Sequence, residues 1–429
     1  MLDFAPSFIS LSLSLTPLKQ FLGIPYAEPP VNEFRFKDPI AKREWKDAYD
    51  ATEFGASCLQ MNVLGGQEDE LVGDEDCLFL NVFTPRVPAQ NGRVPNKASL
   101  LSVMVWLHGG NFNFGDGRID PTPLVDQNII VVSMNYRLGP LGFLNLGLPE
   151  APGNMGLRDQ LEALKWVNAN ILSFGGDPLK VTLFGQSSGA VSAHLHQLSP
   201  LGVGLYRAII CQSGSALSHM VEPLNRRVVE DESIRYVEKI GCDPEGETPF
   251  DDVLNCLYQK NPEDLLFEPG KSIVSTRNED SSVGSMEDNI IADTIAGMGP
   301  FDSFAPSLDK LSEEPFLAKH PYLTIKAGEQ KDLPVIMGIT AYDGGIALAQ
   351  NWDKLAEING NWSYYGPKIV LNLPFDHSKR YDRLIANVTR HFYTGKSPLT
   401  FDETEGIVDL ITDSAYRAPA LKASHLQAR

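Results

Sequence analysis

The most informative part of this chain is the sequence Val181-Thr182-Leu183-Phe184-Gly185-Gln186-Ser187-Ser188-Gly189-Ala190. Strand-forming residues run directly into a G-x-S-x-G motif, and a helical pattern follows from Ala190 to Leu198. This order predicts a nucleophile elbow, a strand-to-helix turn so tight that glycine flanks the serine on both sides. The turn would lift the Ser187 hydroxyl above the sheet. It would also put the Ser188 N–H at a helix N-terminus, where a negatively charged oxygen is stabilised.

Apolar runs along the chain predict the sheet on which this turn is built. The runs cover residues 100–107, 129–134, 206–211 and 333–339, and residues 157–171 carry apolar side chains at helical spacing. Continuous rather than alternating hydrophobicity is typical of strands covered on both faces, so we expect an α/β fold with a mostly parallel central sheet. No internal repeat or linker divides the chain, which favours one domain over residues 21–429 with a polar insertion at 268–300.

Composition and charge exclude several classes of protein. The 429 residues are 43% hydrophobic and 21% charged, enough to bury a large core. The net charge of −19 argues against nucleic acid, whose affinity comes from Lys and Arg on phosphates, and against an anionic membrane surface. No apolar run approaches the length of a transmembrane helix, and we expect neither a metal nor a cofactor.

Residues 1–20 form an atypical N-terminal segment. Residues 8–15 alternate polar and apolar side chains, as a half-buried strand does. A weak secretion signal is an alternative, although no Lys or Arg precedes the apolar part and Pro6 sits early in it. A misassigned first exon is a third interpretation, and the sequence leaves the three open.

The cysteines fall into two groups. Cys58 with Cys77, and Cys242 with Cys256, bracket short loops, and closing either loop would contribute about 3 kcal/mol on the loop-entropy model. Cys211 lies in an apolar run, so we expect a free thiol in the core.

Two glycosylation sequons begin at Asn361 and Asn387. Together with the spaced cysteines they favour an oxidising compartment. We therefore expect a protein that is secreted or that stays in the lumen of the secretory pathway.

A glycine-rich segment follows the first apolar run. In His108-Gly109-Gly110-Asn111-Phe112, glycine lets the backbone turn its N–H groups toward one point. The N–H groups of Gly110 and Asn111 would join that of Ser188 in an oxyanion hole, the set of donors that holds a negatively charged oxygen. An ordinary glycine turn is the alternative, and the nearby elbow makes it the less favoured one.

A carboxylate follows the last apolar run. In Thr340-Ala341-Tyr342-Asp343-Gly344-Gly345, Asp343 comes just past a predicted strand. This is where the acid belongs in a triad whose chain order is Ser, acid, His. The alternative is a surface turn, because Asp-Gly is common in turns.

The order of these motifs resembles that of type B carboxylesterases, the cholinesterase-like group of α/β-hydrolases. Matching motifs cover the chain from about residue 21 to its end, in the order of the family. They are Phe21-Leu22-Gly23-Ile24-Pro25-Tyr26-Ala27-Glu28-Pro29-Pro30, Arg35-Phe36, Glu75-Asp76-Cys77-Leu78-Phe79-Leu80-Asn81-Val82, Asn135-Tyr136-Arg137, Gly153-Asn154, Asp159-Gln160, Phe174-Gly175-Gly176-Asp177-Pro178, the elbow, Gln212-Ser213-Gly214-Ser215 and the turn at Asp343. The resemblance implies an α/β-hydrolase fold and a carboxylic ester hydrolase that works through an acyl-enzyme.

The resemblance also implies particular contacts and a subfamily. It implies the disulfides Cys58–Cys77 and Cys242–Cys256, the ion pairs Arg35–Glu75 and Arg137–Asp159, and a position for Ser213 behind the triad. The acid is usually Glu in this family, so the shorter Asp343 would need a different approach. Gln186, with the region of Trp362 and Pro367, is most similar to arthropod juvenile-hormone-esterase-like members.

One absence limits the substrate. Residues 59–76, between Cys58 and Cys77, contain no aromatic residue. Cholinesterases use a tryptophan of this loop to hold a quaternary ammonium through cation–π contact. Choline esters are therefore not expected, and the expected partner is a small apolar carboxylic ester; the sequence leaves the oligomeric state open.

The catalytic histidine of this family is missing from the chain. It should follow the acid after one more strand, in a Gly-x-x-His context, and no histidine after Asp343 has that context. His194 lies on the elbow helix about 10 Å of rise beyond Ser187, too far to take its proton. Nothing marks the others as a base: His108, His196, His219, His377, His391 and His425.

Without its general base a serine hydrolase loses on the order of a million-fold in kcat. We therefore expect a C-terminally incomplete domain that lacks a final strand and a covering helix, from a partial gene model or a splice fragment of a working esterase. The alternative is a catalytically inactive binding or adhesion protein on the same fold. The presence of Ser187, the oxyanion loop and an acid favours hydrolysis, because a binding protein needs none of the three.

Overall fold

The computed structural model describes most of the chain. The described residues are 4–5, 18–62, 71–87, 99–218, 221, 226–243, 248–268, 271–272, 304–350, 355–360, 362, 366, 380–395 and 404–428. The N-terminal pattern at residues 8–15, the sequon at Asn361 and most of the predicted insertion at 268–300 lie outside them. The domain boundary after residue 20 therefore stays a prediction.

A seven-stranded sheet forms the centre of the protein, in the order β15-β12-β11-β7-β8-β6-β2. Its strands are β2 (Lys19–Pro25), β6 (Phe79–Thr84), β7 (Leu101–Leu107), β8 (Ile130–Met134), β11 (Gly176–Gln186), β12 (Ala208–Gln212) and β15 (Val335–Gly338). The strands from β15 to β8 pair in parallel, whereas β6 and β2 are antiparallel to their neighbours. The predicted mostly parallel sheet is confirmed.

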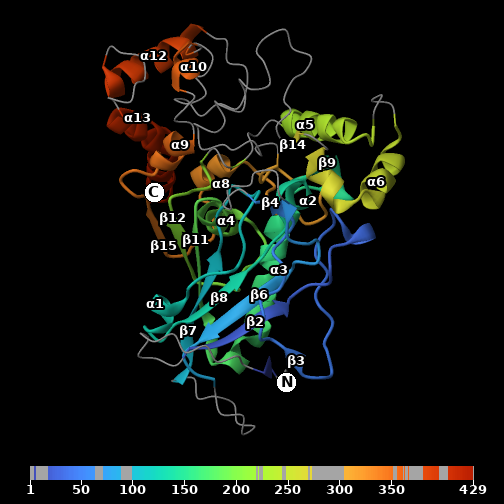
Figure 1. The fold of residues 1–429 in the computed structure, drawn as a ribbon. Helices are drawn as coiled ribbons and strands as arrows, with labels where there is room; N and C mark the ends of the chain where they lie inside the picture. The colour runs from blue at the N-terminus through green and yellow to red at the C-terminus, as the bar shows by residue number, and fades with distance from the viewer. Residues whose placement is uncertain are drawn as a thin grey trace.

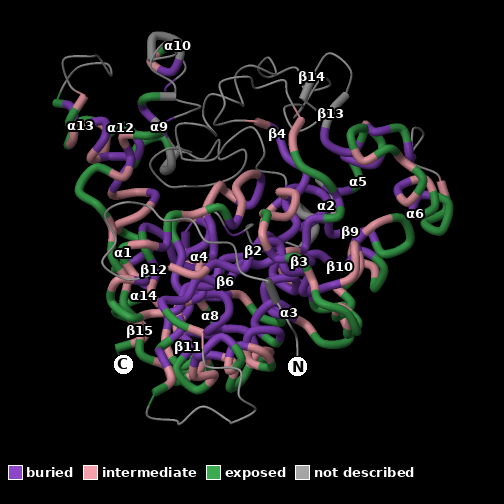
Figure 2. The backbone as a smooth tube through the Cα atoms, turned by 60° about the horizontal axis from the view of Figure 1, so that its bottom comes forward, coloured by how far each residue is buried: buried purple, intermediate pink, exposed green. Residues whose placement is uncertain are grey.

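Helices lie on both faces of this sheet, and among the described residues they cover one face more fully than the other (Figure 1). Alternate side chains of β7, such as Val103 and Val105, join the large core beneath α3 (Met155–Asn170) and α4 (Ser188–Leu198). The side chains between them join a smaller core on the other face, together with Val125 of α1 (Thr122–Val125). The buried residues concentrate along the sheet and these helices (Figure 2), as the continuous apolar runs predict.

The remaining elements surround this centre. Short strand pairs are β1 (Phe4–Ala5) with β3 (Tyr49–Asp50), β4 (Gln60–Met61) with β5 (Leu71–Val72), β9 (Asn145–Leu148) with β10 (Ala151–Pro152), and β13 (Phe267–Glu268) with β14 (Lys271–Ser272). The other helices are α2 (Gly139–Phe143), α5 (Arg226–Lys239), α6 (Phe250–Gln259), α8 (Pro321–Ala327), α9 (Gly345–Gln350), α10 (Leu355–Gly360), α12 (Arg380–Thr394), α13 (Thr404–Ile411) and α14 (Ala418–Gln427). Single turns of tighter or wider helix cover Asn32–Phe34, Ile171–Phe174, Pro262–Leu265 and Thr412–Arg417. Figure 1 shows α9, α10, α12 and α13 gathered at one end of the molecule.

The last strand corrects one prediction. The apolar run 333–339 was expected to be covered on both faces, but β15 alternates half-buried and exposed residues, and Ile336 is 65% exposed. Within the described sheet β15 is an end strand that pairs only with β12. A run of apolar residues therefore predicts the strand correctly, but whether the strand lies inside the sheet or at its end depends on neighbours that the run itself does not specify.

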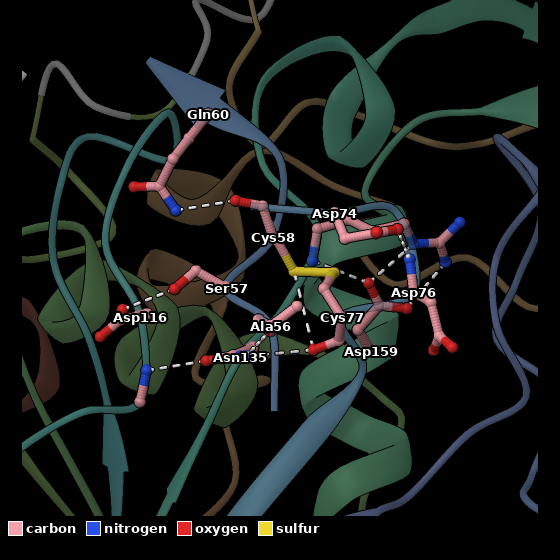
Figure 3. Close-up of a disulfide and its surroundings, with 12 residues drawn as sticks. Ala56, Ser57, Cys58, Gln60, Asp74, Asp76, Cys77, Asp116, Asn135 and Asp159 are labelled. Atoms are coloured by element: carbon pink, nitrogen blue, oxygen red, sulfur yellow. Dashed lines mark hydrogen bonds and ion pairs between the residues drawn. A yellow bond between two sulfur atoms is a disulfide. The ribbon is translucent and has the colours of Figure 1, made fainter. Parts of the chain in front are cut away.

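Both predicted disulfides and both predicted ion pairs are present. Cys58–Cys77 closes with an S–S distance of 2.08 Å and Cys242–Cys256 with one of 2.13 Å, while Cys211 is free and buried. Figure 3 shows that the first disulfide lies beside Asn135, whose side-chain amide donates to the carbonyl of Cys77. The disulfide loop is thereby tied to the chain just before Tyr136.

The ion pairs cross between distant segments and are buried. Arg35 meets Glu75 through two hydrogen bonds of 2.6 and 2.7 Å, and Arg137 meets Asp159 in the same forked geometry at 2.8 and 2.7 Å. Each pair fixes two distant segments relative to each other. Removing one partner would leave an unpaired charge in the interior, which costs several kcal/mol.

No described helix is long and apolar enough to cross a membrane.

Candidate active site

The serine of the G-x-S-x-G motif occupies a tight turn between a strand and a helix. β11 ends at Gln186, Ser187 has φ 56° and ψ −124°, and α4 begins at Ser188. The two glycines leave no room for a side chain: a Cβ on Gly185 would lie 2.4 Å from the Gly189 carbonyl carbon, and one on Gly189 would lie 2.0 Å from the Leu107 oxygen. This crowding explains why both positions are glycine.

The elbow also rests on the next strand. The N–H of Ser187 donates to the carbonyl of Gln212 at 2.9 Å, at the end of β12. A Cβ on Gly214 would lie 2.4 Å from the Ser187 carbonyl oxygen, so the turn that begins at Ser213 packs directly behind the serine. Ser213 itself is buried with φ 55°. These contacts agree with the position that the sequence assigns to Ser213.

The glycine-rich segment lies against the elbow. A Cβ on Gly109 would meet the Ser187 Cβ at 3.2 Å and the Gln186 carbonyl oxygen at 2.8 Å. Gly110, Asn111 and the residue after them all have positive φ, at 105°, 52° and 64°. Successive left-handed residues turn neighbouring N–H groups toward the same side of the backbone, which is the arrangement that binds an anion.

Tyr136 supports this segment, and the sequence marks it only as part of a family motif. Its hydroxyl donates to the His108 carbonyl at 2.8 Å, and its ring stacks on the His108 imidazole with centroids 4.2 Å apart. Burial raises the pKa of Tyr136, which keeps its hydroxyl protonated as a donor. No spacing or composition signal pointed to this role.

Asp343 lies in the turn after β15, near the level of the elbow. One carboxylate oxygen accepts from the backbone N–H of Thr340 at 3.0 Å, and the other accepts from the Thr340 hydroxyl. The following Gly344 packs under α13, where its N–H donates to the Thr412 hydroxyl at 2.9 Å. The carboxylate thus closes its own turn. This geometry agrees with both interpretations of Asp343, the triad acid and the surface turn.

The described histidines have hydrogen-bond partners of their own, cap a helix or are exposed. His194 is fully buried; its Nδ1 accepts from the Ala216 N–H at 3.0 Å, its Nε2 lies 2.8 Å from the Gln427 amide, and burial lowers its pKa to about 4. Burial also lowers the pKa of His108 to about 4 and that of His196 to about 3. His320 caps α8, whereas His391 and His425 are exposed; His219 and His377 lie outside the described residues.

Two further features bear on ligands. Among the described residues no cluster of His, Cys, Asp or Glu could hold a metal ion. A groove of about 560 Å³ lies at the far end of α4 from Ser187, lined by Gln197 and Lys331 among others. It is therefore separate from the elbow.

An elbow serine on a mostly parallel sheet, with helices on both faces, defines an α/β-hydrolase. The family model described as "Carboxylesterase family" matches residues 10–429. The chain therefore belongs to the carboxylesterase family, as its motifs predicted.

The relatives of the chain include arthropod esterases. A carboxylic ester hydrolase of Bombus ignitus is 34% identical over 95% of this chain and 67% of its own length. A juvenile hormone esterase of Tribolium castaneum is 32% identical over 95% of this chain and 66% of its own length. The chain thus spans about two thirds of the length of these relatives.

A solved structure gives the same result for the fold. Juvenile hormone esterase from Manduca sexta, with OTFP covalently attached, matches with a TM-score of 0.77 and 29% identity over 99% of this chain and 74% of that one. The predicted α/β-hydrolase fold and the similarity to juvenile-hormone-esterase-like members are both confirmed.

Proposed function

We propose that this chain is a carboxylic ester hydrolase in which Ser187 is the nucleophile. The observation that carries the proposal is the elbow itself: a serine in a strained conformation, forced between two glycines and faced by a loop of left-handed residues. Strain of this kind costs on the order of 1–3 kcal/mol and persists where the surrounding structure enforces it, which is common at active sites.

The reaction proceeds in two halves. Ser187 Oγ attacks the ester carbonyl carbon as its proton passes to a general base, and the N–H groups of Gly110, Asn111 and Ser188 hold the oxyanion. The tetrahedral intermediate expels the alcohol, which takes up the proton and leaves Ser187 acylated. Water then attacks the acyl-enzyme and releases the carboxylic acid, restoring the serine hydroxyl.

The acid and the base have different support. Asp343 is proposed as the triad acid because of its place in the sheet. Ser187 follows β11, β12 is the next strand, and Asp343 follows β15, the strand after that. The base is not assigned to any described histidine, because the buried ones have lowered pKa values and the others cap a helix or face solvent. Hydrolysis by the chain alone is therefore expected to be slow, on the order of a million-fold below a complete triad.

The substrate and the compartment follow from supporting observations. The loop between Cys58 and Cys77 offers no aromatic side chain to a quaternary ammonium, which favours a small apolar ester; the similarity to juvenile hormone esterases favours a substrate of that character. Two disulfides support an oxidising compartment, hence secretion. Asn387 is exposed on α12 and is a proposed glycosylation site with Asn361.

Labelling of Ser187 tests the proposal. The purified chain is incubated with a millimolar fluorophosphonate, and the modified peptide is identified by mass spectrometry. We expect slow labelling of Ser187 and none in Ser187→Ala. Asp343→Asn should label about as fast as the wild-type chain, because the acid acts only through the base. Absence of labelling in the wild-type chain after a day would contradict hydrolysis and support the alternative, a catalytically inactive binding or adhesion protein.

A further inference from the structure

The oxyanion loop has a strained backbone, which is held in part by hydrogen bonds from the Asn113 and Phe114 N–H groups to the Gly110 carbonyl. Gly110, Asn111 and Phe112 are three successive residues with positive φ, two of them not glycine. Each non-glycine residue in this region costs on the order of 1 kcal/mol, so the conformation needs an external restraint. The restraint has to act near both ends of the segment, because its middle must remain open to an oxyanion.

Side chains from outside the loop supply that restraint at both ends, Ser188 from the elbow helix and Tyr136 from the segment that follows β8. At the C-terminal end, the Phe112 N–H donates to the Ser188 hydroxyl over 3.4 Å. At the N-terminal end, the Tyr136 hydroxyl donates to the His108 carbonyl over 2.8 Å, and the Tyr136 ring stacks on the imidazole. Ser188 also interacts with the Tyr136 hydroxyl, where it lowers the pKa of the phenol against the larger raising effect of burial. These contacts connect Phe112 to Ser188 at one end of the loop and His108 to Tyr136 at the other.

Ser188 has two roles in these contacts. Its backbone N–H is one of the three proposed oxyanion donors, and its side chain is fully buried at the first position of α4. The same residue therefore presents one donor and fixes the loop that presents the other two. The Phe112 N–H also gives this buried hydroxyl a hydrogen-bond partner, as a buried polar group requires.

We propose that the Ser188 hydroxyl and Tyr136 are positioning residues that lock the oxyanion loop onto the nucleophile elbow. The inference rests on the proposed function, because it assigns a purpose to the oxyanion hole. Neither side chain touches the substrate. Their contribution is geometric: a displacement of about 1 Å in a catalytic group costs up to about a hundredfold in rate.

Phosphonylation kinetics separate positioning from stability. We expect Ser188→Ala to lower the maximal rate of Ser187 phosphonylation about tenfold, with the half-saturating probe concentration changed less than about twofold, because the oxyanion forms only as the probe reacts. Tyr136→Phe should act likewise. The double variant should be little slower than the slower single variant, because the two groups act as one unit.

A matched control comes from the same helix. Ser192 is also fully buried on α4, and it accepts a hydrogen bond from Gln160 at 3.2 Å, away from the oxyanion loop. Ser192→Ala should lower the melting temperature much as Ser188→Ala does, yet leave the phosphonylation rate within about twofold. Hydrogen exchange at residues 109–114 should accelerate in Ser188→Ala and stay unchanged in Ser192→Ala.

The outcomes are distinct. An unchanged maximal rate in Ser188→Ala, at any melting temperature, would overturn the positioning role, as would equal losses in Ser188→Ala and Ser192→Ala. Faster exchange without a slower rate would reduce these contacts to a structural feature and likewise overturn it. A wild-type chain that is not labelled at all would instead contradict the proposed function on which the inference depends.

Discussion

Ser187 and Asp343 both follow strands of the same sheet, yet the protein holds them by different means. Ser187 is enclosed by β11, α4, the glycine-rich loop and the turn behind it. Neighbouring backbone atoms come so close that the glycines around Ser187 have no room for a Cβ. Asp343 follows an end strand of the described sheet, and both of its carboxylate oxygens bond to Thr340 in its own turn. The first position is set by packing and the second by local hydrogen bonds.

This difference has a physical meaning for catalysis. Ser187, the proposed nucleophile, has a strained backbone conformation that contacts from several directions enforce. An acid that orients a partner needs a correct direction but no strain, so a turn closed by its own side chain suffices. Substitutions in the two regions should therefore differ in cost, even where the residue type is the same.

Glycine replacement should give the largest contrast. Gly189→Ala would bring a Cβ to 2.0 Å from the Leu107 oxygen, a backbone atom that cannot move without displacing β7. We expect a loss of at least about 4 kcal/mol in the free energy of unfolding, or no folded protein. Urea denaturation measures the loss, and recovery of folded Gly189→Ala with wild-type stability would contradict it.

The matched control is Gly345→Ala, beside the proposed acid. An added Cβ there meets no atom within 4 Å, and Gly345 opens α9. Alanine is the better helix former, so stability should stay unchanged or rise by up to about 1 kcal/mol. Equal losses at the two glycines would remove the distinction between the regions.

Carboxylate replacement should give the next contrast. Asp159→Asn leaves Arg137 buried without its charged partner, which should cost about 3–5 kcal/mol. Asp343→Asn removes only the charge from a partly exposed turn and should cost within about 1 kcal/mol. Chemical denaturation of both variants at one pH compares the costs, and a larger loss for Asp343→Asn would show that this turn is more than local.

Acid should destabilise the fold through its buried histidines. Burial lowers the pKa of His194 and His108 to about 4, so these imidazoles stay neutral in the folded protein while an unfolded histidine titrates near 6.5. Between these values the unfolded chain binds more protons, so stability is present above about pH 6.5 and is lost as the pH falls toward 4. Each residue contributes up to about 3 kcal/mol to this loss.

Urea midpoints measured from pH 7 to pH 4.5 test this dependence. His194→Asn removes one of the titrating groups, so its profile should be shallower than that of the wild type even though the variant is less stable throughout. A wild-type profile that is flat across this window would mean that the imidazoles accept protons without unfolding.

The sequence specified the elbow far better than it specified its supports. Gly185 and Gly189 are fixed by the turn, so a short motif between a strand and a helix was sufficient to predict it. Tyr136 acts across 28 residues of sequence on His108, and no local pattern encodes such a contact. The exposure of β15 could not be predicted for the same reason. The sequence shows the apolar run but not which residues pack against it.

The end strand offers the smallest and cleanest contrast. Ile336 of β15 and Ile209 of β12 lie on paired strands, yet Ile336 is 65% exposed and Ile209 is 1% exposed. Ile336→Ala should change the free energy of unfolding by no more than about 0.5 kcal/mol, whereas Ile209→Ala should cost about 2–5 kcal/mol. Both values come from the same urea titration. A loss at Ile336 that approaches the loss at Ile209 would mean that β15 is covered in solution. The contrast between the packed Ser187 and the locally held Asp343 would then have to be abandoned.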